Sequence, residues 1–318
     1  MPKKIEQLAF GGPEVLQLAE MERPEPQALG PDEVLVRVTA AGVNPIDAKT
    51  RGGRGVSGGM GALPITVGWD LAGTVEAVGS GVSVLATGDR VFGMSRFPGQ
   101  AAAYAQYAVV PAVDLAGIPA VLSDKEAAAL PLAGLTAWQQ LVDVAQVQAG
   151  QRVLVQGAGG GVGHLAVQIA RHLGAYVIAT AGAGKADWLT KLGANEVIDY
   201  RTGDFVEVLR SNPVDVVIDN ICGAVGRRSV EVVKPGGILV ELTGVDPATR
   251  AAADEAGVRA QYQAVHTDAG HLAELAELAG SGKLSVTVSR VFPLEQAAEA
   301  HRAIEEGHTQ GKIVLTTW

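Results

Sequence analysis

The fold class follows from the stretch Val153-Leu-Val-Gln-Gly-Ala-Gly-Gly-Gly-Val-Gly-His-Leu-Ala-Val-Gln-Ile-Ala-Arg171. A short apolar run that fits a buried strand breaks into glycines, and helical periodicity follows at Leu165, Ile169 and Leu173. Glycines allow a tight turn and a close approach of the backbone to a pyrophosphate, whose charge the free N–H groups of a helix start can bind. With a second strand expected over residues 176–180, the stretch predicts a dinucleotide-binding βαβ unit.

The glycines are spaced as Gly157-x-x-Gly160-x-x-Gly163, with Ala158 at the place of the first glycine in the usual G-x-G-x-x-G pattern. Glycines alone would also suit any tight turn between a strand and a helix. The prediction therefore depends on the strand before them, the helix after them and the second strand.

The end of the second strand indicates which dinucleotide is bound. An NAD site usually places a carboxylate there for the ribose 2′-hydroxyl, but no Asp or Glu occurs here before Asp187. The hydroxyl of Thr180, small residues such as Gly182 and the ammonium of Lys185 would accept a 2′-phosphate. We therefore predict NADPH as the cofactor. The alternative is that Lys185 is an ordinary solvated lysine at a helix start.

Length and composition set the broad class. A chain of 318 residues suggests two domains of about 150 residues each. The net charge of −9 argues against nucleic acid or an anionic membrane as partner. No signal-peptide region and no run of membrane-spanning length is found, so a soluble, cytoplasmic protein is expected. The single cysteine, Cys222, excludes a disulfide framework and is expected to be an inert buried thiol.

The first 120 residues look strand-like and turn-rich, with strands over 34–38 and 73–78. Ser123 is a plausible N-cap for a helix with an acidic first turn. Helices and short apolar runs alternate from there, as a parallel sheet with crossover helices requires. The expected strands cover residues 153–155, 176–179, 196–198, 214–218, 238–242 and, more weakly, 258–262.

The last segment predicts a strand over 286–291, a helix over 294–304 and a closing strand over 312–316. These elements either form the edge of the nucleotide-binding sheet or, as we prefer, rejoin the N-terminal domain. The glycine-dense stretch from Gly52 to Gly61 is either a mobile lid or a surface loop.

These motifs together resemble the medium-chain dehydrogenase/reductase superfamily, in its zinc-independent, zeta-crystallin-like quinone oxidoreductase branch. The matching motifs run in family order over essentially the whole chain: Phe10-Gly-Gly-Pro-Glu-Val-Leu16, Ala41-Gly-Val-Asn-Pro-Ile-Asp47, Gly68-Trp-Asp-Leu-Ala-Gly-Thr-Val75, Gly79-x-Gly-Val82, Gly88-Asp-Arg-Val91, Gly134-Leu-Thr-Ala137, the glycine loop, Leu192-Gly-Ala-Asn-Glu-Val-Ile-Asp-Tyr200 and Gly311-Lys-Ile-Val-Leu315. The resemblance implies an α/β fold in which a doubly wound Rossmann domain, residues 123–286, is inserted into a GroES-like β-barrel domain, residues 1–122 and 287–318.

The chain departs from the zinc-dependent relatives, which have a cysteine at the place of Asn44 and Gly-His-Glu at the place of Gly68-Trp-Asp70. Neither Asn44 nor Trp69 is a normal zinc ligand, and the six histidines show no ligand spacing and are expected to be surface or helix residues. We therefore predict no metal.

The resemblance also implies which residues contact the cofactor. Asn44, Pro45 and Asp47 would line the nicotinamide side of the cleft, and Thr136 would lie by the nicotinamide ribose. The pyrophosphate loop would comprise Gly160, Gly161, Val162 and Gly163, and the 2′-phosphoadenosine end would contact Lys185 and Tyr200. Loops at the carboxyl ends of strands would contribute Asn220, Leu242, Thr243, Gly244 and Val265, and Lys312 would be a late lysine near the phosphate. An arginine that one member has near the C-terminal end is Gly307 here, which leaves the C-terminal contacts open.

Several of these residues have plainer interpretations. Asn44 could be a turn residue, Asp47 a helix cap and Lys312 a surface cation. We expect a structural role for Asp89-Arg90 and packing roles for Tyr104, Tyr107, Trp69, Trp138 and Trp188. No proton donor is evident; Lys49 and Tyr104 are speculative candidates, and water could serve.

The resulting hypothesis is an NADPH-dependent reductase that transfers hydride to a small-molecule quinone or activated alkene such as an enone. Two alternatives stay open: a free-standing enoyl reductase of a biosynthetic pathway, and a non-catalytic NADPH-binding sensor. A homodimer is expected, because relatives commonly pair through the nucleotide-binding sheet.

Overall fold

The computed structural model describes all residues, 1–318, and its contacts divide the chain into two units. The first unit comprises Met1–Leu135, His266–Gly282 and Val286–Trp318, and the second comprises Thr136–Val265 and Lys283–Ser285. The expected boundaries at residues 122/123 and 286/287 stay a prediction; by contact, residues 123–135 and 266–282 group with the first unit. No helix is both long and apolar enough to cross a bilayer.

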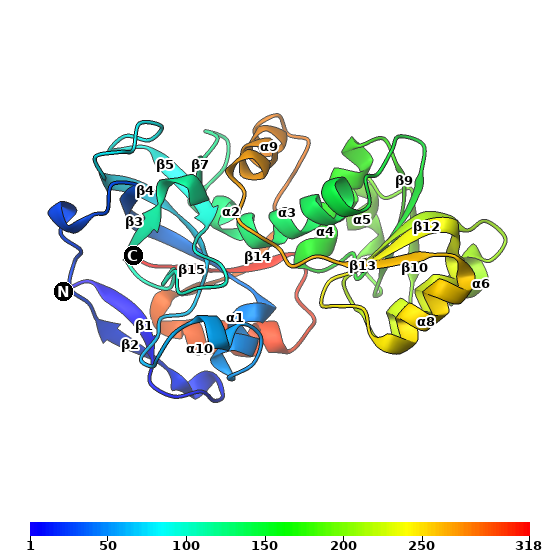
Figure 1. Ribbon diagram of the computed structural model, residues 1–318, viewed down its shortest axis with the longest axis horizontal. Coiled ribbons are helices and arrows are strands. Elements are labelled where there is room, and N and C mark those ends of the chain that lie inside the picture. The colour runs from blue at the N-terminus through cyan, green and yellow to red at the C-terminus, as the bar shows by residue number, and fades with distance from the viewer. The chain divides into compact units, whose positions relative to one another are not determined.

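The first unit is built on a seven-stranded sheet in which β14, β15, β3, β4, β5 and β7 follow one another and β6 pairs with β3. The last strand of the chain joins the N-terminal strands in this sheet, because β15 lies antiparallel to β3, with Ile313 opposite Val43 (Figure 1). A separate hairpin joins β1 and β2. The strands are β1 (Lys3–Gln7), β2 (Leu16–Glu20), β3 (Glu33–Val43), β4 (Asp70–Val78), β5 (Arg90–Met94), β6 (Tyr107–Pro111), β7 (Leu115–Gly117), β14 (Val288–Pro293) and β15 (Lys312–Thr316).

The final segment therefore rejoins the N-terminal domain, as we preferred, and the alternative of an edge on the nucleotide-binding sheet is wrong. The strand predicted over 312–316 is confirmed, and the helix predicted over 294–304 consists of a 3-10 turn, Leu294–Gln296, followed by α10. The helices of this unit are α1 (Pro45–Arg51), α2 (Asp124–Ala129), α9 (Ala269–Gly280) and α10 (Ala297–Glu305); α3 (Pro131–Trp138) contains the boundary between the units.

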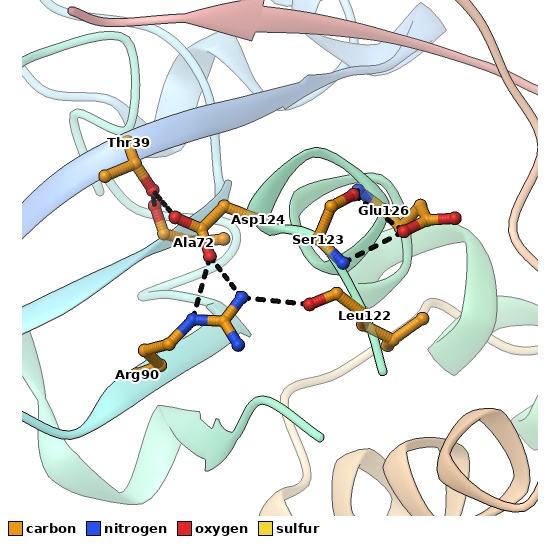
Figure 2. A network of polar contacts seen from close by, with 7 residues as sticks. All are labelled: Thr39, Ala72, Arg90, Leu122, Ser123, Asp124 and Glu126. Carbon is orange, nitrogen blue, oxygen red and sulfur yellow. Dashed lines mark hydrogen bonds and ion pairs between the residues drawn. The ribbon is translucent and has the colours of Figure 1, made fainter. Parts of the chain in front are cut away.

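Helix α2 is joined to the barrel by a polar network (Figure 2). Ser123 is the N-cap of α2 as expected, and with Glu126 it forms a capping box, in which the Ser123 backbone N–H donates to Glu126 Oε2 at 2.9 Å. The Asp124 carboxylate accepts from Arg90 Nη2 at 2.5 Å and from the Thr39 hydroxyl at 2.7 Å. Arg90 is thus structural, as predicted, because its guanidinium links strand β5 to the start of the helix, while Thr39 links β3 to the same carboxylate.

The second unit contains a six-stranded parallel sheet in the order β10-β9-β8-β11-β12-β13. This is the order of a Rossmann domain, in which the strand order reverses between β8 and β11. Ligands bind beyond the carboxyl ends of the strands at that point. All six expected strands are confirmed: β8 (Arg152–Gln156), β9 (Tyr176–Ala181), β10 (Glu196–Asp199), β11 (Val214–Asp219), β12 (Val233–Glu241) and β13 (Arg259–Tyr262).

The core of this unit forms because its central strands are apolar on both faces, as a sheet covered by helices requires. Leu154, Ile178, Val217 and Leu239 are fully buried in one cluster. The covering helices are α4 (Gly161–His172), α5 (Ala186–Lys191), α6 (Phe205–Leu209), α7 (Ala224–Ser229) and α8 (Pro247–Ala256), and a π-helical stretch occupies Gln139–Val144.

Candidate functional site

The glycine loop connects β8 to α4 as the sequence predicts. Gly157 has φ = +66°, a conformation that favours glycine, and Ala158 N donates to Thr180 O at 3.0 Å. A Cβ on Gly163 would lie 2.6 Å from the Ala158 Cα, so the helix can pack on the loop only with glycine at this position. The first helical bond runs from His164 N to Gly160 O. The N–H groups of Gly161, Val162 and Gly163 therefore precede the hydrogen-bonded ladder and can receive an anion.

Thr180 supports this loop from the neighbouring strand. Its hydroxyl donates to Gln156 Oε1 at 2.5 Å and accepts from Gly157 N at 3.3 Å. Because the side chain is buried and committed to the loop, it positions the glycines rather than standing free for a phosphate.

Cationic and aromatic side chains gather beside the loop at the ends of β9 and β10. Lys185 Nζ donates to Gly159 O at 3.4 Å, and a Cβ on Gly182 would lie 3.2 Å from the Tyr200 hydroxyl. Burial, and then the charge of Arg201, lower the pKa of the Lys185 ammonium. We name Lys185, Tyr200 and Arg201 the basic corner.

Arg201 was missed by the sequence analysis. It is exposed, and its guanidinium carbon lies 5.8 Å from the centre of the Tyr200 ring. The available signal was a basic residue directly after the tyrosine at the end of an expected strand. Because its charge acts on Lys185, the two cations border the same region.

The remaining predicted residues of this unit lie at other strand ends, except Thr136, which lies in α3. Asn220 follows β11, donates from Nδ2 to Gln156 O at 3.1 Å, and has a buried Oδ1 with no partner. Leu242, Thr243 and Gly244 follow β12, and Gly244 has φ = +115°. Thr136 is buried in α3, and Val265 follows β13, half-buried.

Cys222 differs from the expectation of a fully buried thiol, since it is only partly buried. It has φ = +66° and lies in the turn after β11, where its backbone N–H donates to Asp219 Oδ1. Burial nevertheless raises the pKa of its thiol, which disfavours the reactive thiolate.

The first unit places Asn44, Asp70 and Lys312 together, all buried. Asn44 Nδ2 donates to Asp70 Oδ2 at 2.9 Å, and Lys312 Nζ donates to Asn44 Oδ1 and lies 3.8 Å from Asp70 Oδ2. The alternative that Lys312 is a surface cation is therefore wrong, because closure of the sheet by β15 buries it. Burial raises the pKa of Asp70 and lowers that of Lys312, and each charge opposes the shift of the other.

Asp47 caps helix α1, which confirms its plainer interpretation: its Oδ2 accepts from Asn44 N at 2.7 Å. The carboxylate is fully buried, and burial raises its pKa to about 7. Its Oδ1 has no partner. Pro45, the first residue of α1, is exposed, as is Lys49 on the same helix.

A buried chain of hydrogen bonds leads away from Asp47. The Tyr104 hydroxyl lies 3.0 Å from Asp47 Oδ2 and 3.2 Å from His301 Nε2, and His301 Nδ1 lies 3.2 Å from Arg51 Nη1. Arg51 also binds Glu305, with Nη2 at 2.6 Å from Oε1.

Arginine fixes the direction of this chain, because a guanidinium can only donate. His301 Nδ1 must accept from Arg51, so its proton lies on Nε2 and is donated to the Tyr104 oxygen. Tyr104 then donates its own proton to Asp47. Burial, and then Arg51, lower the pKa of His301 to about 3, which keeps this histidine neutral.

These contacts correct or confirm several expectations. His301 and His164 lie on helices but are fully buried, so they are not surface residues. Tyr104 packs in the barrel as expected, and burial, followed by the nearby Asp47 charge, raises its pKa well above the usual value, which makes it a poor acid. Trp69 is buried edge-on against Phe97, and Trp188 stacks with His164, as the packing roles predicted.

The stretch from Gly52 to Gly61 contains a 3-10 turn, Ser57–Gly59, and its mobility stays a prediction.

Two family models match the chain. The alcohol dehydrogenase GroES-like domain matches residues 30–120, and the zinc-binding dehydrogenase model matches residues 192–315. The residues present do not fit the zinc site that the name of the second model implies. Asn44 and Asp70 are engaged with the Lys312 ammonium, the Trp69 indole donates to Gly99 O at 2.6 Å, and no group of three or more His, Cys, Asp or Glu residues could hold a metal.

Relatives align over nearly the whole chain. The 2-haloacrylate reductase of a Burkholderia species is 35% identical over 326 residues, covering 96% of each protein. NorB, a spectinabilin polyketide synthase system protein of Streptomyces orinoci, is 39% identical over 319 residues. That match covers 96% of this chain, which spans only 14% of NorB.

Solved structures agree over the full length. The quinone oxidoreductase of Coxiella burnetii superimposes with a TM-score of 0.93 at 36% identity, covering 100% of this chain and 99% of that one. The Escherichia coli quinone oxidoreductase, solved with NADPH, gives a TM-score of 0.87 at 33% identity, with 99% of both chains covered. The chain therefore belongs to the medium-chain dehydrogenase/reductase superfamily, in its quinone oxidoreductase branch, and is an NAD(P)H-type oxidoreductase.

Proposed function

We propose that this protein is an NADPH-dependent reductase that transfers hydride to a quinone or an activated alkene without zinc. The observation that carries the proposal is the basic corner beside the glycine loop. Lys185 and Arg201 place two cations there, with the Tyr200 hydroxyl between the ends of β9 and β10. The Escherichia coli relative that was solved with NADPH supports the same cofactor.

The basic corner favours a phosphorylated ribose for an electrostatic reason. Strand β9 ends at Ala181 with no carboxylate to bind a ribose 2′-hydroxyl or to repel a 2′-phosphate. A phosphate beside two cations gains charge-assisted hydrogen bonds, each contributing about 1.5–3 kcal/mol. NADH lacks that phosphate and gains nothing from the two side chains.

The nicotinamide supplies a hydride when it is bound, so the protein has to orient the reactants and exclude water. Asn44, Asp70 and Lys312 form a rigid, buried group that already satisfies its own charges. Reduction of a quinone suits such a site, because the reduced oxygens are good anions and need little proton catalysis.

A free-standing enoyl reductase is the second candidate. It is favoured by the 39% identity to NorB, a spectinabilin polyketide synthase system protein. An enoyl thioester would require stabilisation of an enolate and a later proton at the α-carbon.

The test compares kcat/KM for NADPH and NADH with a panel of quinones, enones and enoyl thioesters. Lys185→Ala and Arg201→Ala should each raise the KM for NADPH by about 10-fold or more and leave that for NADH nearly unchanged. Lys191→Ala, at an exposed lysine in the last turn of α5, is the matched control. A preference for NADH in the unmodified protein would refute the cofactor assignment. Binding of NADPH without turnover of any substrate would favour the non-catalytic sensor.

The homodimer is part of the same proposal. Strand β13 ends the six-stranded sheet, and its Tyr262 side chain is exposed. An unpaired edge strand can extend its sheet with a second copy. Sedimentation equilibrium should give twice the chain mass, and Tyr262→Arg should weaken the association. A monomer at all concentrations would exclude the dimer.

A further inference from the structure

Two carboxylates face each other at the ends of neighbouring strands in the Rossmann unit. Asp219 is the last residue of β11 and Glu241 the last of β12, and the two are direct partners in the parallel register. Both are buried, at 0% and 1% exposure. A Cβ built on Gly226 of α7 would lie 2.9 Å from Asp219 Oδ2 and overlap Glu241 Oε1. Both carboxylate oxygens therefore lie against the same residue of α7.

The hydrogen bonds of the pair are unequal. Asp219 Oδ1 accepts from the backbone N–H groups of Ile221 at 2.8 Å and of Cys222 at 3.0 Å. Its Oδ2 has no partner, and neither oxygen of Glu241 has one. Three buried carboxylate oxygens without donors are costly, because an unpaired buried charge loses its hydration and gains nothing in return.

The surrounding charges offset the pair only in part. The Asp246 charge at the start of α8 raises the pKa of Glu241 further, and the Arg250 charge on α8 lowers it. Other polar or ionisable groups of the packed elements include Arg227, Arg228 and Ser229 on α7, Asp254 and Glu255 on α8, Arg259 and Tyr262 on β13, and the Cys222 thiol. Arg228 is engaged with Asp204, and Ser229 with Gln156. Burial, and then the Asp219 charge, raise the pKa of Glu241 to about 7, and burial raises that of Asp219.

We propose that Asp219 and Glu241 share one proton, carried by Glu241 and donated to Asp219 Oδ2, and that this bond makes Glu241 a positioning residue for the cofactor loop at 220–222. The proton belongs on Glu241 because two N–H donors already stabilise the ionised form of Asp219, and Glu241 has no donor. One proton turns two facing acceptors into a donor and an acceptor.

The consequence for the cofactor site follows through Asp219. Its Oδ1 holds the turn that carries Asn220, whose unpartnered Oδ1 is a candidate cofactor contact. When Glu241 loses its proton, two adjacent anions repel, and the bonds of Asp219 to the turn weaken. This second step rests on the proposed function; the shared proton does not.

The first experiment measures the stability of the cofactor-free protein by urea unfolding from pH 5 to pH 8. A carboxyl whose pKa is raised on folding stabilises the protein at low pH, and that stability is lost as the pH rises through about 7. Relative to Glu241→Gln, which keeps a donor for Asp219 at every pH, the unfolding equilibrium constant of the natural protein should rise about 70-fold over this range. Glu255→Gln, at an exposed glutamate of α8, should keep the full pH dependence.

Infrared difference spectra give a second readout. At pH 6 the natural protein should show the carbonyl stretch of a protonated carboxylic acid that Glu241→Gln lacks. Asp219→Asn should also lose this band in the folded protein, because its amide donates to Glu241 and favours the ionised form. Equal pH dependence in the natural protein and Glu241→Gln, or no such band, would overturn the shared proton.

The third readout is the Kd for NADPH as a function of pH. The Kd should increase as the pH rises through about 7 in the natural protein and in Glu255→Gln. In Glu241→Gln the Kd should depend less on pH. A parallel rise in Glu241→Gln would overturn the positioning role. A protein that binds no NADPH at any pH would instead contradict the proposed function, and the stability and infrared results would still decide the shared proton.

Discussion

Replacing Tyr104 by phenylalanine removes one oxygen atom from the middle of the buried chain between Asp47 and Arg51. The ring keeps its place in the barrel, so the change isolates two hydrogen bonds, of 3.0 Å to Asp47 and 3.2 Å to His301. His301 cannot move its proton to the other nitrogen, because Nδ1 faces Arg51, which only donates. Its Nε2–H would therefore stay buried and unpaired.

The expected loss of stability follows from the lost hydrogen bond to Asp47 and the unpaired N–H of His301. The bond to the ionised Asp47 contributes about 1.5–3 kcal/mol, and an orphaned buried donor costs about 1–3 kcal/mol. We expect the free energy of unfolding to fall by about 3 kcal/mol at pH 8. The loss should be smaller at pH 6, because Asp47, whose pKa is raised to about 7, is then mostly protonated and gains less from the tyrosine donor.

Urea unfolding followed by circular dichroism at the two pH values measures both effects. Tyr200→Phe, measured on the cofactor-free protein, is the matched control, because it removes a hydroxyl from an exposed ring and should change stability by less than about 0.5 kcal/mol. A loss for Tyr104→Phe no larger than that of the control, or one equal at both pH values, would refute the fixed direction of the chain.

Two further substitutions test the other buried groups. Lys312→Met should lower the free energy of unfolding by about 3 kcal/mol at pH 8, because it leaves Asp70 without its cation. The loss should shrink as the pH falls, because burial raises the pKa of Asp70; urea unfolding measures this, with the exposed Lys283→Met as control. Gly226→Ala should lower the melting temperature by an amount equivalent to about 1–3 kcal/mol, although alanine favours helices, because its Cβ overlaps the carboxylate pair. Gly280→Ala, whose Cβ would meet only Pro119 at 3.4 Å, should be neutral or stabilising, and an equal loss at both positions would contradict the close approach at Gly226.

Local patterns were enough to predict most elements of the fold. The glycine spacing, the six apolar runs and the Ser123 cap depend on residues a few positions apart, and each appears in the structure where it was expected. Family order of motifs then placed the C-terminal strand in the N-terminal sheet, which the pairing of β15 with β3 confirms.

The chemistry of the buried groups could not be predicted in this way. Arg51 and His301 are 250 positions apart and Asn44 and Lys312 are 268 apart, and no periodicity links them. Lys312 looked equally suited to the surface, and His301 looked like an ordinary helix residue.

Local composition therefore specified the elements, their order and the glycine loop, because strand, helix and turn preferences act between near neighbours in the chain. Closure of the barrel by β15 and the alignment of β11 with β12 brought distant polar groups together and removed their water. Burial of that kind sets which carboxyl keeps a proton and which histidine stays neutral, since the cost of a charge depends on the complete surroundings of the group.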